Sequence, residues 1–448
     1  MELFFCRSHT VEIAPRQKKL RLENEDRVMF PLSSMFKAFV RVGALKVIDA
    51  DGKPYRFEGK PGPSVTLRFH DPLLKYSLFL KPELTVGEAY MDERLTIEDG
   101  GLSDLLELYS INCDYLESYP VQRFFRAVSH RLRRFQQNNK IGRAQRNVAH
   151  HYDLGNDFYK FFLDRDMQYS CAFFENPEDT LEEAQRNKQR LIASKMNLKR
   201  GDKVLDIGCG WGGMALYLAT IKDIEVLGVT LSKEQWELAN QRARESGLSD
   251  RVRFELRDYR DVDEKFDSIV SVGMFEHVGV RHYPEFFGRV KELLNEDGVA
   301  LLHSIGHIGP PSFSNEWLRK YIFPGGYSPA LSEVFKVVER SRLWVNDLEI
   351  LRLHYAETLR EWNKRFQSNR EIAEAMYDAK FCRMWELYLY GTEMMFRSGE
   401  QMVFHMQLAH KRDAVPITRD YTMEARDRFR SWEEERDRPV RDITASGD

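Results

Sequence analysis

The sequence lacks the features that mark membrane-spanning, disulfide-bonded and zinc-binding proteins. None of its apolar runs approaches the ~18–20 residues that a helix needs to cross a bilayer, and the opening MELFFCRSHTVE turns polar too soon for a signal peptide. Its five cysteines are scattered and odd in number, and neither a CxxC nor an HExxH spacing occurs. We therefore expect a cytoplasmic protein without disulfide bonds or a bound metal.

An excess of charge of one sign is also missing. Lys and Arg together number 67 and Asp and Glu 70, which leaves a formal net charge of −3. Nothing therefore draws the chain as a whole to nucleic acid, and we expect no nucleic-acid partner; an anionic partner must meet a local basic patch. The 448 residues, of which 42% are hydrophobic, are enough for two or three domains, each with its own core.

One basic patch is the stretch VQRFFRAVSHRLRRFQQNNKIGRAQRNVA, residues 121–149, which contains eight Lys or Arg and no acidic residue. Phe124, Val128, Leu132 and Phe135 recur in it at helical spacing. Two interpretations stay open. The stretch is either a solvated basic linker helix or an amphipathic helix that lies on a membrane surface and meets anionic lipid headgroups.

Residues 1–120 are expected to form a small amino-terminal α+β domain. Within them, GALKVIDADGKPYRFEG alternates like a β-hairpin around Asp51 and Gly52. The segments SVTLRFHD (64–71) and YSLFLKP (76–82) are predicted to be further strands, and LSDLLELYS is predicted to be a helix.

From residue 180 onward, strand-like and helix-like segments alternate. KVLDIGCG, IEVLGVTLS, FDSIVSVGM and VALLHSIG have the apolar character of buried strands, and helical segments separate them. This order indicates an α/β fold with a doubly wound, mostly parallel sheet. Residues 308–400 are richer in aromatics and less regular, so we expect an α-helical lid over the carboxyl edge of the sheet. The domain is expected to cover residues 150–412, and residues 413–448 to form a charged, mobile tail.

The turn LDIGCGWGG follows the first strand of this sheet. Gly208 and Gly210 allow a tight turn and a close approach of the backbone to a ligand. The turn lacks the Lys-Ser/Thr of a triphosphate-binding loop. Asp206, at the end of the strand, suits a cationic ligand better than a pyrophosphate. The turn therefore favours S-adenosyl-L-methionine, whose sulfonium and amino groups are positive, over the alternative of a purely structural turn.

Several longer segments resemble one enzyme family. VLDIGCGWGG resembles the first motif of class I methyltransferases. HYDLGNDFYKFFLD, MQYSCAFF, GVTLSKEQ, DYRDVDEKFDSIVSVGMFEHVG, LLHSIG and KYIFPGG are similar to segments of cyclopropane-fatty-acyl-phospholipid synthases and mycolic acid cyclopropane synthases. The resemblance covers residues 150–410 and is much weaker over residues 1–120. It implies a class I methyltransferase (Rossmann-like) fold and S-adenosylmethionine-dependent chemistry on a lipid.

The resemblance also implies the residues that bind the cofactor. They lie in MQYSCAFF and after the ends of the strands, and they are Tyr169, Ser170, Asp206, Gly208, Gly210, Gly212, Thr230, Gln235, Asp258 and Tyr259. Many methyltransferases end the second strand with an acidic residue that binds the ribose hydroxyls. This sequence has Thr230 and Gln235 there instead, and their hydroxyl and amide groups can make the same hydrogen bonds.

A second implied site holds a bicarbonate ion that serves as the base. Its five positions are Cys171, Glu276, His303, the backbone of Ile305, and Tyr355. His303, Tyr355 and backbone N–H groups are expected to donate to the anion, and Glu276 to orient His303 or to share a proton with the ion. Cys171 is expected to form a weakly polar wall, because no basic residue stands beside it to lower its pKa. A nucleophilic thiol and an ordinary core residue are the alternatives.

Together these features predict methyl transfer from S-adenosylmethionine to the double bond of an unsaturated phospholipid acyl chain, with closure of a cyclopropane ring through a carbocation. A methyl-only product, such as a branched, methylene-bearing or furan-precursor acyl chain, is the nearest alternative. A DNA or protein methyltransferase is disfavoured because SVGMFEHVG replaces the Asn/Asp-Pro-Pro-aromatic run of amino-methylating enzymes. A non-catalytic lipid-binding module is disfavoured because the glycine turn and all five bicarbonate positions are present.

The expected partners follow from this reaction. They are the unsaturated acyl chains of phospholipids and the inner face of the cell membrane, with which the protein would associate peripherally. The oligomeric state stays open, with a homodimer as one option.

Overall fold

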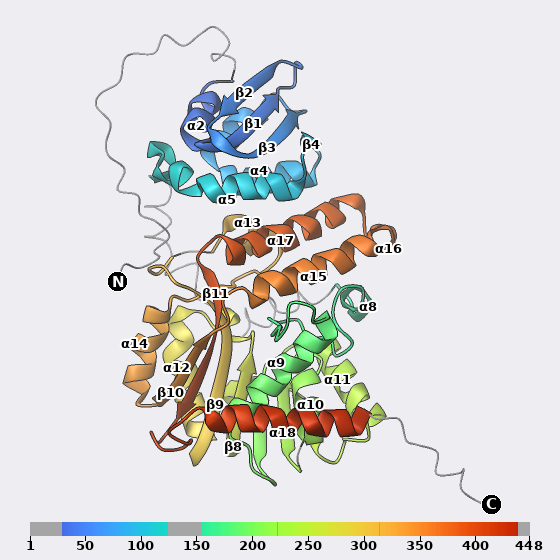
Figure 1. Ribbon diagram of the computed structural model, residues 1–448, viewed down its shortest axis with the longest axis vertical. Coiled ribbons are helices and arrows are strands. Elements are labelled where there is room, and N and C mark those ends of the chain that lie inside the picture. Colours follow the sequence, from blue (N-terminus) through green and yellow to red (C-terminus); the bar gives the residue numbers. More distant parts are fainter. Residues whose placement is uncertain (1–28, 124–153, 222, 313, 438–448) are drawn as a thin grey trace, which may run out of the picture.

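The computed structural model describes residues 29–123, 154–221, 223–312 and 314–437. Most of the basic stretch predicted at residues 121–149 therefore lies outside the described residues. Within them the chain forms two sheets, one of four strands in the order β2-β1-β3-β4 and one of seven in the order β10-β11-β9-β8-β5-β6-β7. Figure 1 shows the small sheet and the large sheet at opposite ends of the molecule, with a layer of helices between them.

The small sheet begins with the predicted hairpin. Strands β1 (Val42–Ile48) and β2 (Pro54–Glu58) pair antiparallel, and Gly52 adopts a φ of 83° in the turn between them. Strand β3 (Lys60–Phe69) then pairs parallel to β1, and β4 (Leu95–Asp99) pairs antiparallel to β3. Helices α2 (Leu32–Phe39) and α5 (Leu102–Ser118) contribute to this core, and α5 confirms the predicted helix at 102–110 and extends further.

The strand predicted at residues 76–82 is wrong. Residues Leu74–Leu80 form helix α3, and α4 (Pro82–Met91) follows it directly. Leu74 and Leu78 are buried while Tyr76 and Leu80 are each 48% exposed. Burial at positions four residues apart is the period of a helix, whereas a half-buried strand would have placed residues 76, 78 and 80 on one face.

The large sheet has the expected mostly parallel order. Strands β5 (Lys203–Ile207), β6 (Glu225–Thr230), β7 (Val252–Leu256), β8 (Phe266–Val272) and β9 (Leu294–His307) run parallel to one another. Strand β11 (Gln401–Ala409) pairs antiparallel to β9. Strand β10 (Trp344–Ile350), which the sequence did not indicate, pairs antiparallel to β11 at the edge of the sheet.

Helices cover both faces of this sheet. Helices α9 (Leu181–Lys195), α10 (Gly213–Ile221) and α11 (Lys233–Glu245) share one hydrophobic core with the strands. Helices α12 (Tyr283–Leu293) and α14 (Leu331–Ser341) pack in a separate core with Phe286, Phe287, Val334 and Val338. The carboxyl ends of the parallel strands are thereby left facing the helical layer, which is where open α/β sheets bind ligands.

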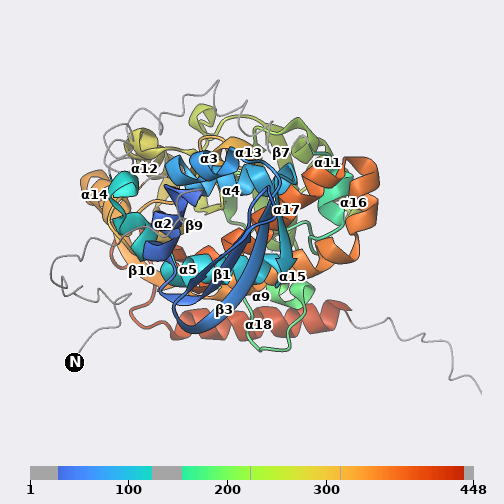
Figure 2. The same ribbon diagram turned by 90° about the horizontal axis from the view of Figure 1, so that it is seen from above.

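The helical layer is the expected lid. It consists of α8 (Asn156–Lys160), α13 (Glu316–Tyr321), α15 (His354–Ser368), α16 (Arg370–Met376) and α17 (Ala379–Arg397), and it lies between the two sheets (Figures 1 and 2). No helix among the residues that the structure describes is both long and apolar enough to cross a bilayer.

The small unit packs directly on this lid. Glu88 of α4 accepts hydrogen bonds from Lys320 at 2.5 Å and from the Tyr321 hydroxyl at 2.9 Å. A Cβ on Gly87 would lie 2.4 Å from the Trp317 ring, so only glycine permits this close approach of α4 to α13. The amino-terminal unit is therefore joined to the lid by both charge and shape.

The expectation of a mobile tail after residue 412 is wrong over residues Asp420–Asp437. These residues form helix α18, which lies across α9 and α10 (Figure 1). Ala425 and Phe429 are buried in the core beneath it, and Glu433, one turn further along, is only 3% exposed. The many charges of this segment suggested a solvated tail, but several of them pair with residues of other elements. Residues 438–448 lie outside the described residues.

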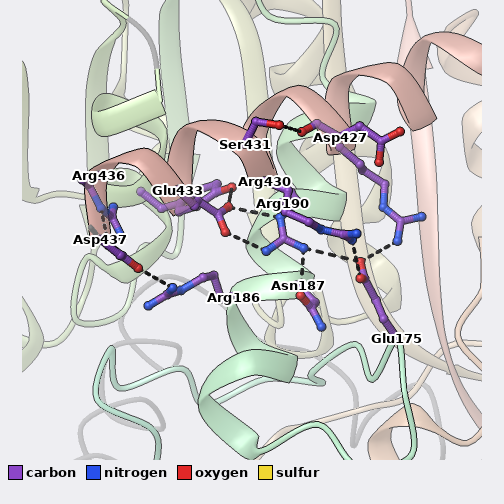
Figure 3. Close-up of polar contacts among 12 residues, drawn as sticks. Glu175, Arg186, Asn187, Arg190, Asp427, Arg430, Ser431, Glu433, Arg436 and Asp437 are labelled. Carbon is purple, nitrogen blue, oxygen red and sulfur yellow. Dashed lines mark hydrogen bonds and ion pairs between the residues drawn. The ribbon is translucent and has the colours of Figure 1, made fainter. Parts of the chain in front are cut away.

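Glu433 is held by two buried groups on α9 and α10. Arg190 donates to it from Nη2 at 2.6 Å and from Nε at 3.2 Å, and the Tyr217 hydroxyl donates at 2.6 Å (Figure 3). Nearby, Glu175 accepts from Arg426 at 2.6 Å and from Arg430. The charged face of α18 is thus the face that attaches it to the domain.

We expect Glu433→Ala to lower the free energy of unfolding by about 3–5 kcal/mol, because it leaves the Arg190 guanidinium buried without its main partner. Urea unfolding followed by circular dichroism measures this loss. The matched control is Glu434→Ala, which makes the same change at the neighbouring exposed position of α18. Equal losses in the two variants would show that the buried ion pair does not hold the helix.

Candidate active site

The glycine turn after β5 forms one wall of a cavity at the carboxyl edge of the sheet. Gly208 and Gly210 line this cavity with φ values of 79° and 55°, which favour glycine. A Cβ on Gly208 would lie 2.7 Å from Cβ and Cγ of Met274, which is the second residue after the end of β8. The turn is therefore held against the β8 loop at a distance that excludes any side chain.

The structure brings all but one of the predicted cofactor-binding residues to this first cavity. Tyr169, Ser170, Asp206, Gly208, Gly210, Thr230, Gln235, Asp258 and Tyr259 line it. Gly212 does not: a Cβ there would lie 2.5 Å from Cζ of Phe254, so this glycine permits packing of the turn against β7. The contact of Gly212 with the ligand stays a prediction.

The polar side chains at the ends of β6 and β7 are oriented by local hydrogen bonds. The Thr230 hydroxyl donates to Oε1 of Gln235 at 2.8 Å, and both residues are buried. Asp258 accepts from Arg260 Nε at 2.9 Å and Nη2 at 2.7 Å, and it accepts from the Arg260 backbone N–H at 3.0 Å. These groups are held in place and retain lone pairs for hydroxyl or amino groups of a ligand.

Asp206 is the electrostatic centre of this cavity. Its Oδ2 is buried without a hydrogen-bond partner among the described residues, and burial raises its pKa to about 7. A buried carboxylate of this kind is stabilised when a cation binds beside it. The sulfonium and amino groups of S-adenosylmethionine are such cations, so the donor and acceptor set fits that cofactor.

Lys188 is a buried residue that sequence reasoning missed. It is 0% exposed on α9, and its Nζ donates to Ser170 Oγ at 3.0 Å and to Oε1 of Gln168. Burial lowers its pKa to about 8, against the opposing effect of Asp164 and other nearby acids. Its residue type and helical position carry no signal in the sequence, because α9 is rich in polar residues throughout.

A second cavity adjoins the first and shares Tyr169, Ser170, Gly273 and His277 with it. All five residues predicted for the anion site line this second cavity: Cys171, Glu276, His303, Ile305 and Tyr355. They come from the segment before α9, from the short helix Phe275–His277 after β8, from β9 and from α15. The structure therefore brings together residues that lie up to 184 positions apart in the chain (355 − 171).

The hydrogen bonds inside the second cavity differ from two expectations. The N–H of Ile305 donates to Oε1 of Glu276 at 2.5 Å, so this N–H is engaged by the carboxylate. Glu276 is also not the partner that orients His303, since Nδ1 of His303 lies 2.7 Å from Nε2 of His405. Register explains both: His303 faces His405 across the β9–β11 pair, and Ile305 lies two residues further along β9.

Glu276 has the character of an acid–base group. Its Oε2 has no hydrogen-bond partner among the described residues, and the residue is only 8% exposed. Burial raises its pKa to about 7, although the hydrogen bond from Ile305 lowers it. A carboxyl group with a pKa near neutrality can hold or release a proton at low cost.

Cys171 lies in an environment that disfavours the thiolate. It is 1% exposed, and burial raises its pKa well above the ordinary range. Lys188 approaches from α9 and opposes this effect, which corrects the expectation that no basic residue is near. Because burial has the larger effect on the pKa and Cys171 lines the second cavity, the structure favours a wall of the cavity over a nucleophile.

Aromatic side chains surround the junction of the two cavities. Tyr169 stacks on Trp362 of α15, with ring centroids 5.0 Å apart, and its hydroxyl lies 2.8 Å from that of Tyr388 on α17. Tyr355 packs against Phe396 with centroids 4.7 Å apart. The π faces of such rings stabilise positive charge where water is excluded.

This fold and site define a class of protein. A seven-stranded sheet with one antiparallel strand beside β9, a glycine turn after its first strand and a buried acid next to that turn are the features of class I S-adenosylmethionine-dependent methyltransferases. The family model described as mycolic acid cyclopropane synthetase matches residues 139–406. The chain belongs to this family.

Relatives and solved structures agree with this assignment. A probable fatty acid methyltransferase from Pseudomonas putida is 36% identical over 353 residues, covering 77% of this chain and 86% of that protein. The cyclopropane-fatty-acyl-phospholipid synthase of Escherichia coli (strain K12) is 42% identical over 259 residues, covering 57% of this chain and 66% of that protein. The cyclopropane synthase MmaA2 from Mycobacterium tuberculosis superposes with a TM-score of 0.57 at 34% identity, covering 59% of this chain and 98% of that one.

We expect Gly208→Val to abolish binding of S-adenosylmethionine, because its side chain would collide with Met274 and its backbone φ of 79° is strained for valine. Isothermal titration calorimetry measures the affinity. The control is Gly201→Val, which has a φ of 85° but open space around the added Cβ, so it carries the strain without the collision. Unchanged affinity in a folded Gly208→Val protein would remove the glycine turn from the cofactor site.

Proposed function

We propose that the protein transfers a methyl group from S-adenosylmethionine to the double bond of an unsaturated phospholipid acyl chain and forms a cyclopropane ring, with bicarbonate as the base. The observation that carries this proposal is the junction of the two cavities at Tyr169, Ser170, Gly273 and His277. One cavity has an unpaired buried carboxylate suited to a cationic cofactor, and the other has the residues suited to a small anion.

The cofactor would supply the methyl group, and bicarbonate would accept the proton that this methyl group loses when the ring closes. The residues around the junction suit the cationic stage of that reaction. The buried thiol of Cys171 is a poor nucleophile, so it would not trap a carbocation. Tyr169, Tyr355 and Trp362 surround the site with π faces and exclude water that would otherwise capture the cation.

The second cavity also offers an apolar surface for an acyl chain. Leu318, Phe323, Met395 and Phe396 line it, and none of these four residues lines the cofactor cavity. A hydrocarbon chain that enters between these side chains would bring its double bond to the junction with Tyr355 and Cys171. Because the proposed substrate is a phospholipid, we also propose that the enzyme works at the inner face of the cell membrane, with residues 121–149 as the basic contact.

A methyl-only product is the second candidate, and the coverage of the relatives favours it. The Pseudomonas putida protein and the tuberculostearic acid methyltransferase UfaA1 of Mycobacterium tuberculosis cover 77% and 72% of this chain, whereas the Escherichia coli synthase covers 57%. Both outcomes use the same site, because they differ only in which carbon of the cation loses its proton.

Mass spectrometry of lipids from cells that express this chain separates the two candidates. Both reactions add one CH2 to the acyl chain, so mass alone does not distinguish them, and the double bonds are therefore derivatised first. We expect the modified chains to have lost a double bond, as a ring requires. Retention of the double bond with the same mass gain would identify the methyl-only product, and no labelled acyl chain from labelled methionine would refute both.

We expect His303→Ala and Glu276→Ala to lose about 10²–10⁴-fold in activity, the usual range for groups that serve acid–base chemistry. Cys171→Ser should retain measurable activity, because serine is similar in size and Cys171 forms no bond in the reaction. Added bicarbonate should raise the rate of wild-type protein that was prepared in carbonate-free buffer. An inactive Cys171→Ser protein with a covalent adduct on wild-type Cys171 would make the thiol the nucleophile and contradict this assignment.

A further inference from the structure

A buried line of polar groups leads from the second cavity across strands β9 and β11 to the surface. Nδ1 of His303 lies 2.7 Å from Nε2 of His405, and Nδ1 of His405 lies 2.9 Å from Nζ of Lys195. Lys195 in turn forms an ion pair with Glu349 of β10. His303, His405 and Lys195 are 2%, 1% and 4% exposed, whereas the side chain of Glu349 is 39% exposed.

The donors and acceptors in this line determine where each hydrogen lies. An ammonium between a carboxylate and an imidazole can only donate, so Nδ1 of His405 accepts from Lys195. A neutral imidazole with an accepting Nδ1 carries its hydrogen on Nε2, and His405 therefore donates from Nε2 to Nδ1 of His303. His303 must then carry its own hydrogen on Nε2, the nitrogen opposite the one that His405 engages.

Both imidazoles are neutral in this environment. Burial and the nearby lysines lower the pKa of His303 well below its ordinary value. Burial and the same lysines lower the pKa of His405 in the same way. A single hydrogen atom then lies between the two rings. The partner of Nδ1 of His405 determines which of the two rings carries it.

We propose that Lys195 and His405 are positioning residues that hold His303 in the tautomer whose Nε2–H faces the second cavity. His303 then donates a hydrogen bond to the anion and does not itself remove the proton. This inference rests on the proposed function, because it assigns the base to the anion that His303 holds. Glu349 keeps Lys195 in place and compensates its charge at the outer end of the line.

Two substitutions of His405 test the direction of the hydrogen bonds. In His405→Gln the amide can accept from Lys195 through its oxygen and donate to His303 through its nitrogen, so the direction is kept. In His405→Glu the carboxylate only accepts, so it requires the hydrogen of His303 to move to Nδ1. The two side chains are nearly equal in size, which makes each the control for the other.

The readout is the bicarbonate concentration that gives half-maximal activity, together with cofactor affinity by calorimetry. We expect His405→Gln to stay within about threefold of wild type and His405→Glu to need at least about tenfold more bicarbonate, the loss of one hydrogen bond to an anion. Cofactor affinity should be unchanged in both. An equal bicarbonate requirement in the two variants would overturn the proposal.

Neutron diffraction from crystals of the deuterated wild-type protein decides the tautomer without any activity. A deuteron on Nε2 of His303 and on Nε2 of His405 supports the inference, and a deuteron on Nδ1 of a neutral His303 overturns it even if the His405 variants do not fold. If bicarbonate does not stimulate the wild-type enzyme, the proposed function fails in its choice of base, while the neutron result still decides how the line of hydrogen bonds is arranged.

Discussion

Two carboxylates that are removed from water organise both cavities of this enzyme. Asp206 and Glu276 each have one oxygen without a hydrogen-bond partner among the described residues, and burial raises the pKa of each to about 7. A buried carboxylate is costly unless it meets a cation or shares a proton. Asp206 lines the cavity that fits a cationic cofactor, and Glu276 lines the second cavity.

The segment that carries Tyr169, Ser170 and Cys171 has no regular secondary structure, and other elements hold it in place. On one side, the N–H of Ala172 donates to the Thr358 hydroxyl of α15 at 3.0 Å. On the other side, Glu175 is bound by arginines of α18 (Figure 3), and Arg426 lies 5.5 Å from the centroid of the Phe173 ring. Helix α18 follows the region that the family model matches, so this chain braces the segment with an element beyond that region.

The amino-terminal unit meets the site through the lid. Glu88 contacts Lys320 and Tyr321 of α13, the same helix from which Leu318 lines the second cavity. The matched solved structure covers 59% of this chain and 98% of its own, so the extra unit is added to a domain that is otherwise of the same extent. Its contact with α13 ties one wall of the second cavity to a second folded core.

Features that depend on neighbours along the chain could be predicted from the sequence. The hairpin at Asp51 and Gly52, the parallel strands and the glycine turn follow from local periodicity and from the conformations that glycine alone adopts. The motif resemblance identified the segments that carry Cys171, Glu276 and His303, and the structure brings these residues to one cavity. Residue types in order along the chain were sufficient for these conclusions.

Features that depend on partners far apart in the chain were decided only by the tertiary structure. The charges of α18 suggested a mobile tail because the sequence does not show that Arg190, 243 positions earlier, is buried against Glu433. Likewise, the register of β9 with β11 brings His405 to His303, and the packing of α9 brings Lys195 to His405. Glu276, after β8, accepts from the N–H of Ile305 on β9. The free energy of a buried polar group depends on the partner it meets, and the fold, not the local sequence, determines which partner that is.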